Sequence, residues 1–327
     1  MHVVGVEVFS ALVGLVVASI AAPFVFKALI AVKSRQTISK FIQDHAHKQG
    51  TPTMGGFIVL IGVIAAMAVF WNPALVGPAV VLLGYALIGL FDDFIIPRIK
   101  PGSRGFDWIP KLGLQVLVAV GGVYLSGLHS PLELALGAFF ILFFCNAYNF
   151  SDGLDSLSGG LGMLLCLGFL GLLFKCPEVL GSDLTTSTMA RVVCGGLLGG
   201  FIPFMVLNAP PAKVFMGDVG SLPIGGLFGL LWYRMLTQFW HAYGWQGAIP
   251  LVVLSGIMLV EIIPGPIQIF WVKAFKRRAF PFKTPVHHGF QEKGWPETRI
   301  AWLFHLGQLV LVLIAIASID YLKLVKF

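Results

Sequence analysis

Charged side chains are scarce in this sequence. Only 11% of the 327 residues are Asp, Glu, Lys or Arg, whereas 57% are hydrophobic. A soluble domain carries about 25% charged residues, so this composition excludes an ordinary soluble fold and predicts an integral membrane protein. The longest polar segment, residues 273–299, is too short to bury a core of its own. We therefore expect a single polytopic membrane domain over residues 1–327.

Cysteine is also scarce, and basic residues are absent near the amino terminus. The four cysteines lie in or beside apolar runs without CxxC spacing, so we expect them to be packing residues rather than metal ligands or disulfide partners. They are Cys145, Cys166, Cys176 and Cys194. The first Lys or Arg is Lys27. A signal peptide carries a basic flank before its hydrophobic run, so we expect the first apolar run to stay in the membrane as an anchor.

Long charge-free stretches recur through the chain. Residues 54–91 contain no charge over 38 positions, about twice the ~20 residues that one transmembrane helix needs. Trp71, Asn72 and Pro73 in their middle predict a tight hairpin. The sequence thus predicts an all-α integral membrane protein of about ten transmembrane helices, with spans at residues 8–26, two within 54–91, 112–132, 134–151, 156–174, 192–207, 219–239, 247–272 and 300–319.

The distribution of Lys and Arg gives these spans an orientation. If the loop after the first span is cytoplasmic, 17 of the 22 Lys and Arg lie on the cytoplasmic side, the exceptions being Lys175, Arg191, Arg234, Lys323 and Lys326. Cytoplasmic loops are enriched in these residues, so we expect both termini on the outer face. The net charge of +7 favours anionic headgroups of the lipid bilayer and an anionic, phosphorylated substrate. No nucleic-acid partner is expected.

The decapeptide NAYNFSDGLD, residues 146–155, places two carboxylates and two amides between charge-free runs of 18 and 19 residues. Such chemistry does not face lipid, so we expect it at a membrane surface. Gly153 is expected to let the chain turn sharply, and Asp152 and Asp155 would share a face if the turn continued as a helix. A helix cap would explain a lone Asp-Gly pair, but further clusters on the same side favour a functional site.

Two more acidic groups fall on the predicted cytoplasmic side. Asp92 and Asp93 are expected to end the third span, where the helix dipole disfavours negative charge, so a cation should lie near them. Asp218 follows Gly217 in VFMGDVGS, where we expect the amides of residues 219–221 to start a helix and receive a phosphate. Carboxylates and amides among basic loops suit Mg²⁺, which proteins hold with one or two carboxylates and substrate phosphates.

Three other polar segments bear on function. His287 and His288 have no Cys or third His at ligand spacing, so a phosphate or sugar contact is favoured over zinc. Glu261 lies within the ninth span, before a Pro-Gly-Pro break at Pro264. An acid inside a span suggests a functional role, but we favour a structural one in which freed backbone amides and Gln268 satisfy it. GTPTMGG, residues 50–56, is either a flexible loop with close helix packing or part of the site.

Taken together, six segments resemble the polyprenyl-phosphate N-acetylhexosamine-1-phosphate transferases, and specifically the phospho-N-acetylmuramoyl-pentapeptide transferase family. They are GTPTMGG, FDD (residues 91–93), NAYNFSDGLD, FMGDVGS, Glu261 with Gln268, and PVHHGFQEKGWPE (residues 285–297). The resemblance implies a ten-helix homodimer in the bacterial inner membrane, with periplasmic termini and a cytoplasmic-face active site. It implies Mg²⁺-dependent transfer of phospho-MurNAc-pentapeptide from UDP-MurNAc-pentapeptide to undecaprenyl phosphate, giving lipid I and UMP in the first membrane step of peptidoglycan synthesis.

The same resemblance assigns roles residue by residue. It implies that Asp92 and Asp93 are the catalytic pair and that Asp218 is the catalytic magnesium ligand. The substrate-binding residues are then Lys48, Lys111, Asn146, Asn149, Asp152, Asp155, Phe215, His287 and His288. Within this set Lys48 and Lys111 are expected to contact phosphate.

Two positions depart from the family pattern. Ile96 stands where the family usually has a lysine, and Gly289 stands where it has a third consecutive histidine. Both departures concern phosphate binding. Arg98 or Lys100 is a candidate replacement for the missing lysine.

Alternatives remain open at this stage for both the function and the chemistry. A sister enzyme that moves GlcNAc-1-phosphate from UDP-GlcNAc is opposed only by GTPTMGG and the KGWPE loop. A transporter is favoured by Glu261 but opposed by the lack of an internal repeat. For the transfer itself, we favour direct attack by the already anionic lipid phosphate over a covalent aspartyl intermediate.

Overall fold

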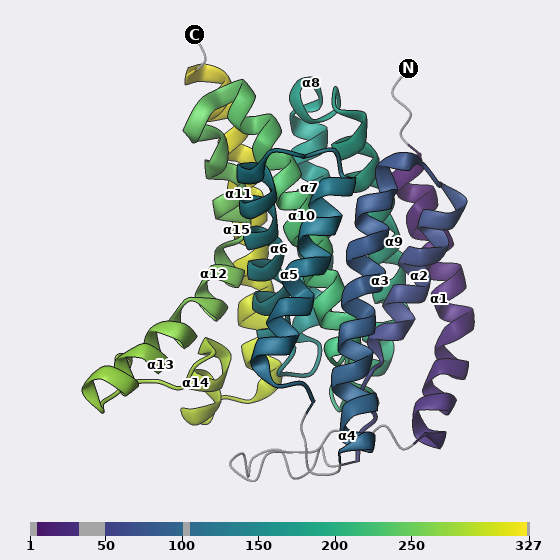
Figure 1. Ribbon diagram of the computed structural model, residues 1–327, viewed down its shortest axis with the longest axis vertical. Helices are drawn as coiled ribbons and strands as arrows, with labels where there is room; N and C mark the ends of the chain where they lie inside the picture. Colours follow the sequence, from purple (N-terminus) through teal and green to yellow (C-terminus); the bar gives the residue numbers. More distant parts are fainter. Residues whose placement is uncertain (1–4, 33–49, 101–104, 326–327) are drawn as a thin grey trace.

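The computed structural model describes residues 5–32, 50–100 and 105–325, and each regular element in these ranges is a helix. The long helices stand side by side as a bundle (Figure 1). They are α1 (Val6–Ala31), α2 (Gly56–Val69), α3 (Val76–Leu90), α5 (Trp108–Leu125), α6 (Pro131–Phe150), α7 (Leu157–Lys175), α9 (Leu184–Asn208), α10 (Asp218–Tyr243) and α15 (Glu297–Val325). The all-α prediction is confirmed.

Nine helical stretches in the described residues are long and apolar enough to cross a membrane. A further apolar helix, α2, has 14 residues, fewer than the ~20 that a span needs. The predicted ten spans therefore correspond to nine full-length stretches and this shorter helix. The hairpin predicted between the second and third spans is confirmed, because the Asn72 side chain accepts a hydrogen bond from Ala74 N (3.0 Å) and caps the 3₁₀ turn Pro73–Leu75.

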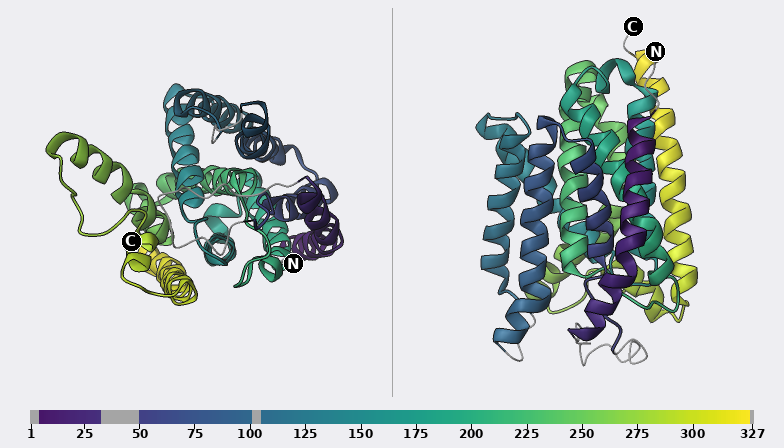
Figure 2. Two further views of the ribbon diagram at one scale, coloured as in Figure 1. Left: turned by 90° about the horizontal axis from the view of Figure 1, so that it is seen from below. Right: turned by 90° about the vertical axis from the view of Figure 1, so that its right-hand side faces the viewer.

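Helix α10 lies in the interior of the bundle (Figure 2). Of the most apolar 18 residues in the stretch Asp218–Leu254, which begins with α10, 94% are buried. The corresponding share is 22% for α1 and 33% for α15. Glycines allow α6 to approach it closely: a Cβ on Gly225 would lie 2.6 Å from Phe144 O, and one on Gly229 would lie 2.6 Å from Ile141 Cα. Small residues at helix contacts are typical of membrane bundles. The start of α10 is therefore held firmly inside the protein.

The third span does not end at its two aspartates. After α3 the chain continues through a π-helical segment, η3 (Phe91–Ile95), and a last α-helical turn, α4 (Ile96–Ile99). The expectation that Asp92 and Asp93 end the helix was therefore wrong. Residues 89–96 contain no proline that would interrupt the helix, so the aspartates lie within it.

The ninth span is broken into three pieces, and the Pro-Gly-Pro segment predicted one of the two breaks, the one after residue 262. Helix α11 (Ala248–Leu254) is followed by α12 (Gly256–Ile262) and then by α13 (Pro264–Phe275), which leaves the bundle at the lower left of Figure 1. Helix α13 exposes large apolar side chains, among them Ile269 and Phe270. The short helix α14 (Val286–Glu292) then leads the chain back to α15.

The two ends of the bundle differ in what they carry. The start of α1, the short helix α8 (Pro177–Leu180) and the end of α15 lie at one end (Figures 1 and 2). Helices α4, α13 and α14 lie at the opposite end, where η3 and the start of α10 also meet. The predicted functional segments therefore gather at the end away from the chain termini.

Candidate active site

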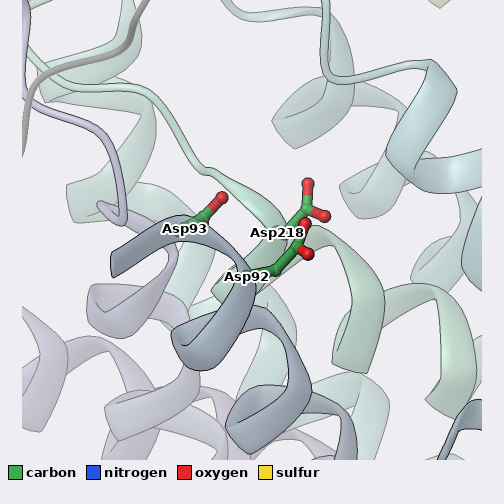
Figure 3. Close-up of side chains that lie close together, drawn as sticks. All are labelled: Asp92, Asp93 and Asp218. Atoms are coloured by element: carbon green, nitrogen blue, oxygen red, sulfur yellow. The ribbon is translucent and has the colours of Figure 1, made fainter. Parts of the chain in front are cut away.

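Asp92 and Asp93 project from η3 toward the start of α10 (Figure 3). A π-helix bonds residue i to residue i+5 and so takes more residues per turn than the 3.6 of an α-helix, which brings neighbouring side chains closer in angle. Two consecutive aspartates can thus serve one site. Single π-turns inside α-helices are frequent at functional sites, which fits this position.

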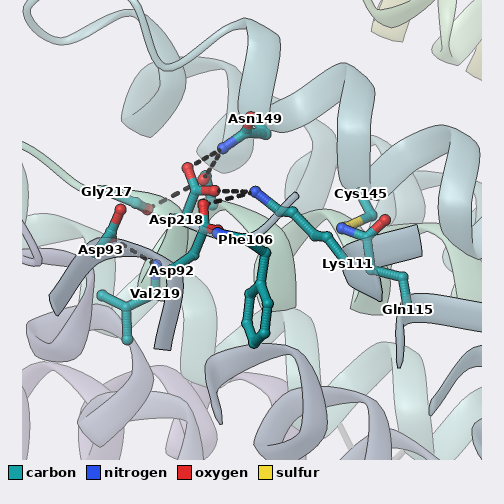
Figure 4. A network of polar contacts seen from close by, with 11 residues as sticks. Asp92, Asp93, Phe106, Lys111, Gln115, Cys145, Asn149, Gly217, Asp218 and Val219 are labelled. Atoms are coloured by element: carbon teal, nitrogen blue, oxygen red, sulfur yellow. Dashed lines mark hydrogen bonds and ion pairs between the residues drawn. The ribbon is translucent and has the colours of Figure 1, made fainter. Parts of the chain in front are cut away.

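Asp218 is the first residue of α10 and follows Gly217, whose φ of 72° is a left-handed conformation that favours glycine. A Cβ at position 217 would also lie 2.7 Å from Asp93 Oδ2. Val219 N donates a hydrogen bond to that same Asp93 oxygen (3.2 Å; Figure 4). The predicted helix start is therefore present, but the amide of Val219 binds the carboxylate of Asp93 rather than being open to a phosphate.

Lys111 of α5 is the cation expected beside the aspartates. Its Nζ donates to Asp92 Oδ2 (2.9 Å) and to Asp218 Oδ2 (2.6 Å), as Figure 4 shows. The three side chains are between 12% and 22% exposed, so these charges attract one another more strongly than a fully hydrated surface pair does. Lys111 thus ties the π-helical segment to the start of α10.

The carboxyl end of α6 contributes an amide to the same cluster. Asn149 Nδ2 donates to Asp218 Oδ1 (2.7 Å) and to Ser221 Oγ (2.8 Å) (Figure 4). Each oxygen of Asp218 therefore accepts one hydrogen bond, one from Asn149 and one from Lys111. This arrangement fixes the plane of the carboxylate.

Asp152 and Asp155 hold the loop that precedes α10. Asp152 Oδ2 accepts a hydrogen bond from Gly217 N (3.1 Å), and Asp152 Oδ1 accepts one from Ser158 Oγ (2.7 Å). Asp155 Oδ2 accepts from Ala212 N (2.9 Å). The decapeptide after α6 thus sets the position of the loop residue that directly precedes Asp218.

The turn itself does not rely on a left-handed glycine. Gly153 does not have a positive φ, whereas Ser156 does, at 64°. The turn expected at Gly153 is present, but it does not depend on a left-handed conformation of this glycine. Asp152 and Asp155 lie in the turn between α6 and α7, outside both helices, so they do not share a helix face.

Two predicted substrate-binding residues make side-chain contacts outside this cluster, and a third is not among the described residues. Asn146 Nδ2 donates to the carbonyl of Leu142 in its own helix (2.7 Å). His288 Nδ1 lies 2.7 Å from Gln291 Oε1. Lys48 lies outside the described residues. The predicted roles of Asn146, His288 and Lys48 therefore stay predictions.

The GTPTMGG segment packs directly against FMGDVGS. Phe215, half-buried, donates its backbone N–H to Pro52 O (2.9 Å), and Gly55 N donates to Phe215 O (2.7 Å). A Cβ on Gly56 would lie 2.4 Å from Gly220 Cα. The glycines therefore allow close packing, two residues from Asp218 along α10.

His287 has a partner that the sequence did not indicate. Its Nδ1 lies 2.6 Å from Glu261 Oε2, and both side chains are completely buried. Gln268, the partner expected for Glu261, instead accepts hydrogen bonds from Ala279 N and Phe280 N, both at 3.0 Å. The expected partner was therefore wrong, because the contact joins residues 26 positions apart, whereas the sequence argument considered only near neighbours.

The candidate replacements for the missing lysine and the glycine in place of the third histidine have different surroundings. The guanidinium of Arg98 stacks on Phe94 at 3.8 Å and donates to Val32 O at the end of α1, so it is engaged away from the three aspartates. Lys100 is exposed at the end of α4. A Cβ on Gly289 would lie 3.0 Å from Phe282 Cβ, so a third histidine at this position would require Phe282 to shift.

One backbone contact of the cluster was not foreseen. Phe106 N donates to Asp92 Oδ1 (2.7 Å). The preceding Gly105 has a φ of 127°, and a Cβ there would lie 2.4 Å from the same oxygen. A glycine before an aromatic residue in a basic loop is too common a pattern to have indicated this contact.

The carboxylates of Asp92, Asp93 and Asp218 form the one group among the described residues that is close enough to hold a metal ion. Their ligand oxygens lie within 4.8 Å of one another. Two ligands at 2.0–2.1 Å from one Mg²⁺ are at most about 4.2 Å apart, so small side-chain rotations suffice to bring them to one ion. Hard carboxylate oxygens are the ligands that Mg²⁺ prefers. The residues present therefore fit magnesium.

Comparison with known proteins agrees with this arrangement. Residues 75–236, which contain Asp92, Asp93, Lys111 and Asp218, match glycosyl transferase family 4. The chain is also 30% identical over 315 residues to a protein of Rhodopseudomonas palustris (strain BisA53) named phospho-N-acetylmuramoyl-pentapeptide-transferase. The match covers 86% of this chain and 82% of that protein.

Proposed function

Because the chain belongs to the phospho-N-acetylmuramoyl-pentapeptide transferase family, we propose that it transfers phospho-MurNAc-pentapeptide from UDP-MurNAc-pentapeptide to undecaprenyl phosphate, forming lipid I and UMP. The observation that carries this proposal is the cluster in which Asp92, Asp93 and Asp218 meet Lys111. Phosphoryl transfer depends mainly on positioning and on neutralising phosphate charge. This cluster has both the carboxylates to bind a cation and an ammonium of its own.

Magnesium is the proposed cofactor. Asp218 is its main ligand in this proposal, with Asp92 or Asp93 as the second, and Lys111 neutralises phosphate charge beside them. When bound, Mg²⁺ supplies positive charge that stabilises the developing charge on the transferred phosphate. Asn149 orients Asp218 through its 2.7 Å hydrogen bond.

The substrate contacts that the sequence predicted are also part of this proposal. Lys48 and Lys111 contact phosphate, and Asn149, Asp152 and Phe215 form the nucleotide site. Asn146, Asp155 and His288 complete the substrate-binding set of the proposal. His287 is left out, because its side chain is fully buried against Glu261.

Direct attack by the lipid phosphate is the proposed chemistry. Asp93 accepts a hydrogen bond from Val219 N at the amino end of α10, where the helix dipole further stabilises a negative charge. Asp92 accepts from Phe106 N and from Lys111. A carboxylate oxygen whose lone pairs already accept hydrogen bonds is a weaker nucleophile than a free one. A phosphomonoester with a second pKa of about 6 is already anionic near neutral pH.

We further propose that the end of the bundle that carries the site faces the cytoplasm of a bacterial cell, with both termini periplasmic. Single cysteines test this, because the four native cysteines are buried. Lys293→Cys lies in the segment between α14 and α15, and Ser182→Cys lies near α8 at the opposite end; both positions are exposed. A membrane-impermeant thiol reagent added to intact cells should label position 182 and spare 293. The reverse pattern would invert the orientation. A homodimer stays a prediction.

Two alternatives can be separated from this proposal. The transporter interpretation rested on Glu261, which is buried and paired with His287. The sister reaction with UDP-GlcNAc is tested by UMP release from each sugar nucleotide in the presence of Mg²⁺ and undecaprenyl phosphate. We expect release from UDP-MurNAc-pentapeptide and little from UDP-GlcNAc. The opposite preference would establish the sister activity.

A further inference from the structure

Glu261 and His287 form an isolated polar pair in the interior of the protein. Both side chains have no exposed surface, and Glu261 Oε2 lies 2.6 Å from His287 Nδ1. Glu261 Oε1 also accepts a hydrogen bond from the backbone N–H of His287 (3.3 Å). Two contacts to one carboxylate fix both the backbone and the ring of His287. The pair thereby connects α12, which ends just before the break in the ninth span, to the short helix α14.

The other edge of the imidazole faces the decapeptide. His287 Nε2 is buried and has no hydrogen-bond partner among the described residues. A Cβ on Gly153 would lie 2.5 Å from Nε2 and 3.2 Å from Cε1 of this ring. Since the φ of Gly153 is not positive, its backbone would accept an alanine, and the three atoms nearest to the added Cβ all belong to the His287 ring. Buried polar atoms without a partner are rare and call for an explanation.

Gly153 lies directly beside a residue that sets the geometry of the cluster. Its neighbour Asp152 accepts the hydrogen bond from Gly217 N at 3.1 Å. Gly217 immediately precedes Asp218, the carboxylate bound by Lys111 and Asn149. A displacement of the turn at Gly153 therefore reaches Asp218 through a single hydrogen bond and one peptide unit.

We propose that Glu261 and His287 are positioning residues that act on the active site through Gly153. Glu261 fixes the imidazole of His287, and the edge of that ring limits how far the turn at Gly153 can move. Asp152 in the same turn thereby keeps Gly217 in place. Asp218, the next residue, then stays within reach of Lys111. The pair contacts no substrate in this account. The proposal rests on the proposed transferase function and adds a device, built from the broken ninth span, that keeps the site aligned.

The test is a steric double-mutant cycle with Gly153→Ala, His287→Asn and the double variant. Asparagine is shorter than histidine, so it retains an amide near Glu261 but withdraws the ring edge from Gly153. We expect Gly153→Ala to lower kcat at least tenfold with a much smaller change in KM, since a misplacement of about 1 Å can cost 10²-fold in rate. The double variant should recover to the rate of His287→Asn alone.

A matched control comes from the neighbouring helix. A Cβ on Gly160 would lie 2.3 Å from His305 Nε2, a comparable clash that does not involve Asp152 or Gly217. Gly160→Ala should therefore lower the thermal unfolding temperature in detergent without the selective loss of kcat. Glu261→Ala should reproduce the loss seen in His287→Asn, and Glu261→Gln, which still offers an oxygen acceptor, should lose less.

The outcomes separate this proposal from the transferase function itself. A Gly153→Ala variant with normal kcat, or a double variant no faster than Gly153→Ala, would overturn the positioning role. If the wild-type chain transferred no phospho-sugar at all, the same cycle would be measured by thermal unfolding. Non-additive unfolding temperatures would then support the contact between residues 153 and 287, and additive ones would refute it.

Discussion

Lys111 Nζ lies 2.6 Å from Asp218 Oδ2 and 2.9 Å from Asp92 Oδ2, so one ammonium joins two carboxylates that arise 126 positions apart in the chain. The positive charge of Lys111 is the compensating charge that was expected beside acidic residues on a helix. This arrangement also places the one described lysine of the predicted phosphate pair directly beside two of the three clustered carboxylates.

Replacement of Lys111 by methionine should lower the transfer rate by about 10²–10³-fold, the usual loss when one preorganised donor to developing negative charge is removed. The physical reason is the loss of the cation beside Asp218 and the substrate phosphate. The measurement is kcat/KM for UMP release. Lys175→Met is the control, since Lys175 pairs with Asp320 on the exposed surface. A Lys111→Met variant as active as this control would exclude a phosphate role for Lys111.

Asp218→Asn should abolish magnesium-dependent transfer and weaken divalent-metal binding. The amide has one oxygen fewer to offer and no charge, so the three-carboxylate group loses its central member. Binding is followed directly with Mn²⁺ by electron paramagnetic resonance, without substrate. Asp107→Asn, an exposed acid at the start of α5, should bind Mn²⁺ like the wild type. Unchanged Mn²⁺ affinity in Asp218→Asn would show that other carboxylates hold the ion.

Arg234 and Asp183 form a partly buried ion pair at the end of the bundle opposite the site, with side chains 7% and 19% exposed. Arg234 also donates to Ser126 O (3.0 Å). Removing one partner of a buried ion pair costs about 3–5 kcal/mol of stability. Because Asp183 is partly exposed, we expect Arg234→Met to cost about 3 kcal/mol or less. The unfolding temperature in detergent should fall clearly more than in Lys175→Met, which removes a surface pair worth about 0–1 kcal/mol. Equal losses would show that the pair contributes little.

The same pair predicts how stability depends on pH. Burial acts to raise the pKa of the Asp183 carboxyl, but the hydrogen bond from Thr186 and the charge of Arg234 outweigh it, so the pKa lies below its usual value. A carboxylate with a lowered folded-state pKa stabilises the protein above its unfolded pKa of about 3.9 and loses this contribution as the pH falls through the folded value. Between pH 6 and pH 3 the wild type should therefore lose more unfolding temperature than Asp183→Asn. Parallel losses would contradict the pKa direction.

Isotope exchange separates the two chemical routes. A covalent aspartyl intermediate would exchange labelled UMP into UDP-MurNAc-pentapeptide without any lipid, whereas direct attack requires lipid phosphate or lipid I to be present. We expect no lipid-independent exchange, because oxygens of both Asp92 and Asp93 already accept hydrogen bonds. Robust exchange that disappears in Asp93→Asn would identify Asp93 as the nucleophile.

Much of the fold could be predicted because lipid imposes strong constraints on sequence. Charge-free runs marked the spans, the Trp-Asn-Pro sequence at residues 71–73 marked a hairpin, and Pro264 marked the break in the ninth span. These signals are local. The shortness of α2 and the departure of α13 from the bundle depend on neighbouring helices, so no local pattern indicated them.

The site was predictable in its parts but not in its contacts. Resemblance brought Asp92, Asp93 and Asp218 together, and charge compensation predicted a cation near the first two. The π-helical turn that lets both aspartates face α10 has no proline or glycine to mark it. The partner of Glu261 was missed for a different reason: His287 reaches it across a reversal of the chain, which sequence spacing does not encode.

The central claim is that phospho-MurNAc-pentapeptide moves from its UDP carrier to a lipid phosphate at the Asp218 cluster. The most direct measurement is mass spectrometry of the purified protein incubated with UDP-MurNAc-pentapeptide, undecaprenyl phosphate and Mg²⁺. The account predicts UMP and the undecaprenyl diphosphate-linked product in equal amounts, and neither with Asp218→Asn. UMP formed without a lipid-linked product, or the same product yield from Asp218→Asn, would contradict it.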